Sequence, residues 1–530
     1  MLPSVNRNVY ACKLMVSMVK QSPRYFIITE MFILDILPKQ SYITDRHFNL
    51  HDTKKKGFEK MKKIISVILL CAMAITLCAC GDKGAKAFEE ASQMYDAGDY
   101  AGAFAILDEN RDSGNADIQT LLGDCYYFGQ GTEQDYTKAA EMYAAAAEQG
   151  SAGAQYALGS MYLDGSGVKQ DYSKAVDLCT KAYEQGNMDA CVTLGYMYEN
   201  GYGVTRDMAK AVELYTEAAD AGMAWGQNNL GWCYYYGEGV DYDLNKAAEL
   251  FETAASQENI NARYGLGLCN FDMGNYKTAL DCFKTATEAD YPGAKDMLAI
   301  CYLFGYGTDV DEAEAFKLLK EAVNETHDTD SMYYLAQCYL FGVGSEPDTD
   351  TAISWFTSAA EAGNIDAQVF LGDLYLGARD GYVEMDTEEG IKWMTMAADA
   401  GDGDSMYVLE QIYRMPFYGV VDMDKSLEYC KMAIENGIVD AADDLDQYDM
   451  DDSDYIDWTI KGAELGSMRC QVNMAGAYCD GEYGLEKDFA EAAKYLKMAK
   501  DNTDSSYYYT MVQLVDQYPD HYPELKDLMA

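Results

Sequence analysis

Histidines and clustered carboxylates are the residues of this chain that could bind a metal ion or transfer a proton. After position 80 the chain has two histidines, His327 and His521, so a Cys–His or Ser–His–Asp group would need one of them. We expect both to lie on the surface. The aspartates of 449–454 are grouped as in a calcium-binding loop, but the glycine and glutamate at the sixth and twelfth positions of such a loop are missing. The sequence therefore predicts no catalytic residue, no metal site and no cofactor, with a weak Ca²⁺ site as an alternative.

Ser166 and Lys169 have the Ser-x-x-Lys spacing that penicillin-recognising serine enzymes use for their nucleophile. The neighbouring similar segments, 131–134 and 202–205, read Gly-Thr-Glu-Gln and Tyr-Gly-Val-Thr. Because neither keeps the serine and the lysine, we interpret the spacing as a coincidence and expect a non-enzymatic protein.

Twelve cysteines occur from Cys80 onward, and no Cys-x-x-Cys pair typical of a zinc site is among them. Five of them occupy the same place in similar segments of the chain, and even adjacent copies of this place are too far apart for the short Cα separation that a disulfide requires. These five are Cys125, Cys233, Cys269, Cys301 and Cys338. We expect the cysteines after Cys80 to be small buried apolar residues.

The elements that carry these residues repeat along the chain. One leucine occurs five times at intervals of 36 residues, as Leu122, Leu158, Leu194, Leu230 and Leu266. It then recurs at spacings of 32, 37, 36, 38 and 36, as Leu298, Leu335, Leu371, Leu409 and Leu445. A fixed period of this size indicates stacked supersecondary units.

Each period predicts two helices. The first half reads Ala-x-x-x-Leu-Gly-x-x-Tyr and the second reads Lys-Ala-x-x-x-aromatic-x-x-Ala-Ala, so each puts its small and apolar residues on one helical stripe. Between them stands Gly-x-Gly-Val-x-x-Asp, as in Gly201, Gly203 and Asp207. The glycines can adopt positive φ at a helix end, and the aspartate can cap the second helix.

The residue positions that recur from one period to the next, which we call columns, resemble those of Sel1-like repeats, the longer-looped relatives of the tetratricopeptide repeat. Residues 87–113 and 262–288 lack the glycine loop and look like plain tetratricopeptide units, and from Glu410 to Trp458 the glycine columns decay. The resemblance implies an all-α protein, an α-solenoid of about 12 helix-turn-helix repeats over residues 87–506, whose concave face is lined mainly by the first helices. Residues 507–530 are expected to form a capping helix and tail.

A second signal precedes the repeats. Lys62 and Lys63 are followed by an apolar run from Ile64 to Leu77 and by Leu77-Cys-Ala-Cys80, the pattern of a secretory signal. The last four residues resemble the bacterial lipobox, which implies a lipoprotein signal peptide over 61–79, lipid attachment at Cys80 and a lipidated tether over 80–86. The resemblance predicts a lipid-anchored protein on the extracytoplasmic side of a bacterial membrane, and an uncut membrane anchor is the alternative.

Residues 1–60 precede this signal, although a signal peptide starts at the amino terminus. They contain no repeat and hold ten Lys or Arg against five Asp or Glu. We therefore interpret 1–60 as an upstream extension of the reading frame that is not part of the fold, with translation starting at Met61.

The repeats are strongly acidic. The whole chain has a net charge of −48; residues 1–79 hold 12 basic and 5 acidic residues, so the remaining 451 carry 28 against 83, a net charge of −55. Such a charge opposes binding to nucleic acid and to anionic lipid, which leaves the acyl chains on Cys80 as the membrane contact.

The residues after each first-helix alanine vary between repeats, and in related solenoids such positions face the groove. Tyrosine, asparagine and glutamine there suit peptide recognition. We predict a protein or peptide partner of basic character, bound by Gln155, Tyr156, Gln227, Asn228, Asn229, Tyr264, Tyr333 and Tyr334. Two alternatives stay open: an envelope accessory or hydrolase acting on peptidoglycan or a β-lactam, and a cation-binding acidic surface protein.

Overall fold

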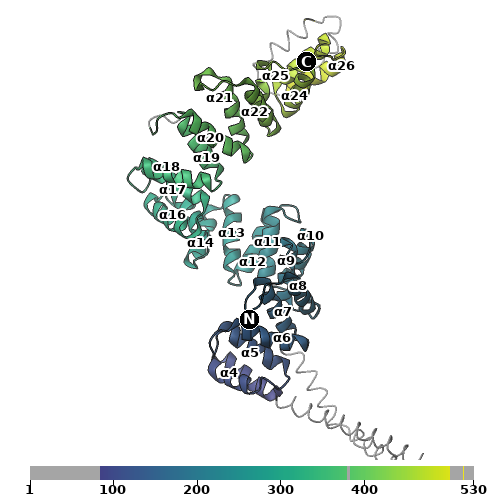
Figure 1. Cartoon of the computed structure of the whole chain (residues 1–530), viewed down its shortest axis with the longest axis vertical. Coiled ribbons are helices and arrows are strands. Elements are labelled where there is room, and N and C mark those ends of the chain that lie inside the picture. The colour runs from purple at the N-terminus through teal and green to yellow at the C-terminus, as the bar shows by residue number, and fades with distance from the viewer. Residues whose placement is uncertain (1–83, 379–381, 502–516, 518–530) are drawn as a thin grey trace, which may run out of the picture. The chain divides into compact units, whose positions relative to one another are not determined.

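The computed structural model describes residues 84–378, 382–501 and 517, and these residues form a chain of helix pairs (Figure 1). Residues 84–96 are helical and α4 (Tyr100–Glu109) follows. Eleven helix pairs come after α4 in the described part of the chain. Their first helices are α5 (Ala116–Phe128), α7 (Ala152–Asp164), α9 (Met188–Asn200), α11 (Ala224–Tyr236), α13 (Ile260–Asp272), α15 (Ala294–Phe304), α17 (Thr329–Phe341), α19 (Ile365–Tyr375), α21 (Gly403–Arg414), α23 (Val439–Asp443) and α25 (Met468–Asp480).

The second helices are α6 (Tyr136–Glu148), α8 (Tyr172–Glu184), α10 (Met208–Asp220), α12 (Leu244–Ala255), α14 (Tyr276–Glu288), α16 (Glu312–Thr326), α18 (Thr349–Glu361), α20 (Thr387–Asp399), α22 (Met423–Glu435), α24 (Asp452–Leu465) and α26 (Phe489–Asp501). Each second helix packs on the first helix of its own pair, and each one from α6 to α24 also packs on the next first helix along the chain. This all-α arrangement of tandem pairs is the predicted α-solenoid.

The loop within the regular pairs follows the predicted chemistry. Gly201 ends α9 in the left-handed conformation with φ of 72°, and Gly203 has φ of 72° as well. A Cβ on Gly203 would lie 2.5 Å from the carbonyl oxygen of Tyr172, so the close approach to the preceding second helix also requires glycine. Asp207 then caps α10 by accepting a hydrogen bond from the Lys210 N–H at 3.0 Å.

The glycine after the repeated leucine lets the two helices of a pair touch. A Cβ on Gly195 would lie 2.5 Å from a ring carbon of Tyr215, which is fully buried on α10. Gly231 meets Phe251 on α12 in the same way, at 2.8 Å. The aromatic ring of the second helix therefore fills the space that a side chain would need.

The predicted departures from the period are also visible. The α13–α14 connection is a short turn through Met273 and Gly274, as expected for a plain tetratricopeptide unit. Between 410 and 458 the pattern is replaced by two 3₁₀ turns, η1 (Pro416–Tyr418) and η2 (Leu445–Gln447), and by the five-residue helix α23.

The predicted extension 1–60, the signal peptide 61–79, Cys80, His521 and most of the tail 507–530 lie outside the described residues. The helix at 84–96 begins inside the segment 80–86 that was predicted as a tether. Among the residues that are described, the helices are too short or too polar to span a bilayer.

Candidate functional site

The predicted partner-binding glutamines lie inside the repeat scaffold. Gln155 and Gln227 are both 7% exposed. The amide of Gln155 donates to the Ala147 carbonyl near the end of α6 at 3.3 Å and accepts from Gln185 Nε2 at 2.7 Å. Gln227 forms the same two bonds, to Ala219 at 3.5 Å and from Gln257 at 2.8 Å. These side chains satisfy helix-end carbonyls, which otherwise lack partners, so they are not available to a partner and the prediction is corrected for them.

Asn228 also differs from the prediction, because it is 3% exposed and its amide donates to Asn229 Oδ1 at 2.9 Å. Asn229 itself is half-buried. Asn229 also hydrogen-bonds the Tyr215 hydroxyl, so both asparagines have partners within the fold.

The four predicted tyrosines are all half-buried, and they differ in their neighbours. Tyr156 packs against the core around α8 and α9, and Tyr264 lies 4.9 Å from Tyr291 between ring centroids. Burial raises the pKa of both phenols above the ordinary value. Tyr333 and Tyr334 join a larger group of rings.

This larger group, which we call the central aromatic group, contains Phe271, Tyr276, Phe304, Tyr306, Tyr333 and Tyr334. Its successive ring centroids lie 4.6–5.9 Å apart, within the range of favourable aromatic pairs. The rings come from α13, α14, α15, α17 and the loop after α15, and they include Phe304, which is 48% exposed. Its exposed rings lie at the carboxyl end of the first helix α15 (Phe304) and at the start of the second helix α14 (Tyr276), not after the first-helix alanine as predicted.

Carboxylates flank the central aromatic group. Asp330 and Asp366 lie near Tyr334, and burial together with the Asp330 charge raises the pKa of this phenol. Asp330 accepts a hydrogen bond from Asn364 Nδ2 at 2.7 Å, which fixes its position at the edge of the rings. An aromatic surface bordered by negative charge suits a side chain that is both apolar and cationic.

Among the described residues, the cysteines and His327 have structural roles. All eleven cysteines from Cys125 to Cys479 are free and buried, as predicted, and burial raises the pKa of Cys125 and Cys179 to about 12. Such thiols stay protonated at neutral pH and are poor nucleophiles or metal ligands. His327 is exposed, as predicted, and ends α16 in the left-handed conformation.

The acidic segment 449–454 is used within the fold. Asp451 caps α24 by accepting from the Asp454 N–H at 2.9 Å, and Asp454 pairs with Lys431 at 2.5 Å. Within the described ranges, no cluster of three His, Cys, Asp or Glu side chains is placed to hold a metal ion.

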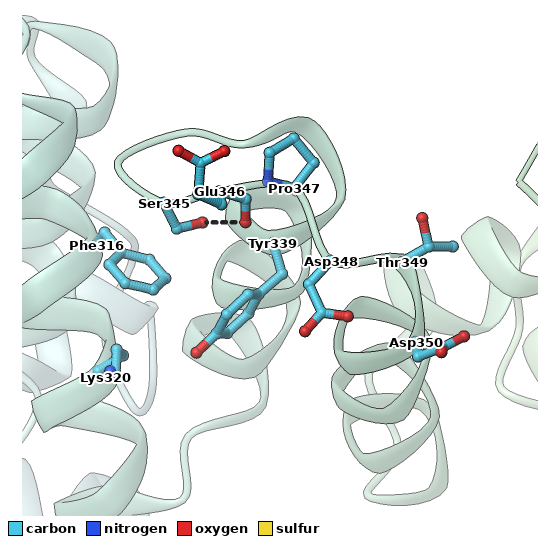
Figure 2. A pocket seen from close by; sticks show the side chains of 9 residues that line it. All are labelled: Phe316, Lys320, Tyr339, Ser345, Glu346, Pro347, Asp348, Thr349 and Asp350. Atoms are coloured by element: carbon cyan, nitrogen blue, oxygen red, sulfur yellow. Dashed lines mark hydrogen bonds between the residues drawn. The ribbon is translucent and has the colours of Figure 1, made fainter.

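A shallow pocket of about 630 Å³ lies beside Tyr339, and Figure 2 shows its lining. Phe316 and Lys320 of α16 form one wall, Tyr339 of α17 forms another, and residues 345–350 complete it. The rings of Phe316 and Tyr339 meet edge to face with centroids 5.2 Å apart. Glu346, Asp348 and Asp350 give the lining three carboxylates against one ammonium group.

Sequence reasoning missed both this pocket and a buried polar network around Glu410. Glu410 takes the place of the repeat glycine and is fully buried, where it accepts from Arg414 Nε at 2.7 Å and from the Tyr448 hydroxyl. Arg414 also binds Asp444 at 3.0 Å. The network fills the space that the small residues Ser426 and Cys430 leave on α22, so it replaces the aromatic contact of the regular pairs.

Comparison with protein families gives one match. The Sel1 repeat model matches residues 116–151, 152–187, 189–223, 226–259, 293–327, 329–364, 365–402, 414–438 and 469–504, which is more than half of the chain. It passes over 260–292 and 439–468, where the period departs from the glycine-loop pattern.

Solved structures with similar folds include c5321, a protective antigen of uropathogenic Escherichia coli with an SLR fold. It is 27% identical over 81% of this chain and 97% of that chain, with a TM-score of 0.48. A Sel1 repeat protein from Oxalobacter formigenes is 26% identical over 59% and 99%, with a TM-score of 0.30. Yeast Tom70 is 14% identical over 84% and 97%, with a TM-score of 0.31. No curated protein matches the chain.

Proposed function

The chain belongs to the Sel1 repeat family, and we propose that it is a surface-anchored, non-enzymatic scaffold that binds a protein or peptide partner of basic character. Sel1-like and tetratricopeptide-like solenoids are generally protein-binding and non-catalytic. The proposal adds where the partner binds, what chemistry it has and how the protein is held at the membrane.

The central aromatic group is the observation that supports this binding surface best. It joins rings from three consecutive first helices, and Phe304 and Tyr276 present exposed edges to solvent. Large rings supply contact area with few rotatable bonds, which is why aromatic residues dominate the energetics of protein interfaces. Of the residues predicted from the sequence, Tyr333 and Tyr334 contribute to this surface.

The basic character of the partner rests on charge. The chain carries 88 acidic and 40 basic residues, and Asp330 and Asp366 border the rings at Tyr334. Complementary charge accelerates encounter and excludes acidic competitors more than it increases affinity. Binding is therefore expected to weaken as salt shortens the Debye length below about 10 Å.

Anchoring by lipid on Cys80 completes the proposal, and it rests on the Leu77–Cys80 sequence alone. Replacing Cys80 by Ala should release the protein from the membrane fraction or leave it unprocessed. Fractionation followed by palmitate labelling measures this directly. Label that persists in the Cys80→Ala protein would contradict lipid attachment at this residue.

The binding surface is tested by capture from a cell-envelope extract with the wild-type chain and with a Phe304→Ala, Tyr334→Ala double variant. Loss of two interface aromatics should lower capture at least tenfold, since such residues contribute about 2 kcal/mol or more each. Phe417→Ala is the matched control, because Phe417 is 75% exposed on η1 and lies outside the central aromatic group.

Equal capture by the double variant and the wild type would contradict the proposed surface. Circular dichroism of all three proteins must stay helical for the comparison to hold. Turnover of wall fragments or of a β-lactam by the purified chain would instead contradict the non-enzymatic role.

A further inference from the structure

Several repeats place one of their own lysines over a tyrosine. Lys138 Nζ lies 5.3 Å from the ring centroid of Tyr126, and it pairs with the helix-capping Asp135 at 3.2 Å. Lys174 does the same with Tyr162 at 4.8 Å and with Asp171 at 3.6 Å. Each lysine stands three residues after its capping aspartate, so the arrangement belongs to the repeat and not to one site.

The contact between lysine and ring recurs at two more pairs. Lys246 Nζ lies 4.3 Å from the Tyr234 ring centroid, and Lys425 Nζ lies 4.9 Å from that of Tyr413. An ammonium group over this tyrosine is therefore a recurrent contact of the fold, and at Lys138 and Lys174 it also pairs with the capping carboxylate. Cation–π attraction and the carboxylate charge both favour it.

The α17–α18 pair keeps the tyrosine and the aspartate but lacks the lysine. Tyr339 and Asp348 are present, and Thr351 occupies the lysine position. The Thr351 hydroxyl donates to Asp348 at 2.7 Å, so it replaces one hydrogen bond of the ammonium group but not its charge or its reach over the ring. The pocket of Figure 2 lies at this place.

The pair α5–α6 is a close internal match for the open pocket. Phe104 of α4 meets Tyr126 with centroids 5.4 Å apart at 89°, and Phe316 of α16 meets Tyr339 at 5.2 Å and 82°. The loop approaches the preceding helix in the same way, because a Cβ on Gly131 or on Gly344 would lie 2.2 Å from a carbonyl oxygen of that helix. The two places differ at two positions: Thr351 stands where Lys138 stands, and Lys320 of α16 lines the pocket where α4 has Asp108.

We propose that the pocket beside Tyr339 binds the ammonium group of a lysine side chain from the partner, in the place that the fold's own lysine occupies over Tyr126. The inference rests on the proposed function, since it names the partner residue that this scaffold recognises. The ammonium group would contact the Tyr339 ring and Asp348, with Glu346 and Asp350 adding negative charge at the rim.

Two features support a cation at this place. Hydrogen bonds from the Thr351 N–H and hydroxyl hold the pKa of Asp348 below its ordinary value, so the carboxylate stays charged at neutral pH. Lys320 lines the pocket, but its Nζ lies over the Phe316 ring at 5.3 Å, and three carboxylates outnumber it.

The test uses the full chain with its threonine methyl groups labelled for NMR, because Thr349 lines the pocket. The probe is Nα-acetyl-lysine methylamide, and the norleucine analogue is its uncharged match. We expect the lysine probe to shift the Thr349 methyl signal in a saturable way and the norleucine probe to leave it unchanged.

Three variants distinguish the lysine place from general attraction to an acidic protein. Thr351→Lys restores the repeat's own ammonium group and should weaken the probe's apparent affinity at least tenfold. Thr351→Val keeps the shape without the hydroxyl and should retain binding. Lys138→Thr should open the matching place at Tyr126, so that the methyl group of Thr137, whose N–H bonds Asp135, begins to respond.

A Thr349 shift that persists in Thr351→Lys, an equal shift with the norleucine probe, or no response of Thr137 in Lys138→Thr would overturn the proposal. Such a result together with reduced capture by the Phe304→Ala, Tyr334→Ala variant would leave the scaffold function intact. If the probe test fails in this way and the Phe304→Ala, Tyr334→Ala variant also captures as well as the wild type, the proposed function itself is contradicted.

Discussion

The regular pairs from α5 to α12 and the central pairs from α13 to α18 have the same helices but use charge differently. In the regular pairs, Lys138, Lys174, Lys210 and Lys246 each stand three residues after the capping aspartate. The central pairs have Thr278, Glu314 and Thr351 at that position. The regular pairs therefore have a lysine of their own at this position. In the central region Lys284 of α14 lies over Tyr302 at 5.6 Å, and the place at Tyr339 and Asp348 lacks the repeat lysine.

This difference shows how to separate scaffold from function in a repeat protein. A residue that recurs in one column, such as Gln155 and Gln227, is explained by contacts between repeats. Thr351 stands at a repeat position that is lysine in the regular pairs, and contacts between repeats do not explain this change. The binding surface is better sought at positions that lack the residue usual in the repeat than at positions that merely vary.

The largest expected loss of stability in the regular region comes from replacing the first-helix glycine that faces the second helix. Gly195→Val should destabilise the regular region by about 2–3 kcal/mol, because even its Cβ would lie 2.5 Å from the buried Tyr215 ring. Since each pair is stabilised only by its neighbours, the loss should appear by hydrogen exchange first in α8 to α11.

A smaller effect is expected for the reciprocal change in the central region. Ala336 occupies the same column as Gly195 and is fully buried. Ala336→Gly should cost about 1–2 kcal/mol from lower helix propensity and a lost methyl contact. Loss of protection that spreads equally over all pairs in either variant would contradict a neighbour-dependent array.

The sequence predicted the architecture well, because the columns that define it repeat many times. The glycine loop at Gly201 and Gly203 and the cap at Asp207 are as expected, and so are the buried cysteines. Because the same pattern occurs in many helix pairs, a departure from it in one repeat does not change the predicted fold.

The site was harder to predict, because exposure cannot be read from one column. Gln155 and Gln227 vary from their neighbours, yet their partners Gln185 and Gln257 stand 30 residues later in both cases. That constant separation was the available signal of a scaffold contact. Glu410 gave a second signal, since a charged residue in a glycine column requires a compensating network.

The central claim is that the partner contacts the central pairs through rings and carboxylates. In the regular pairs, the repeat's own lysine stands at the corresponding position. The claim is tested by selecting peptides from a random displayed library on the immobilised chain and mapping the tightest one by hydrogen exchange. The account predicts a lysine beside an aromatic residue in the enriched peptides, with protection at α15, α17 and the loops 305–311 and 342–348. Protection confined to 116–255, or enriched peptides without lysine, would contradict it.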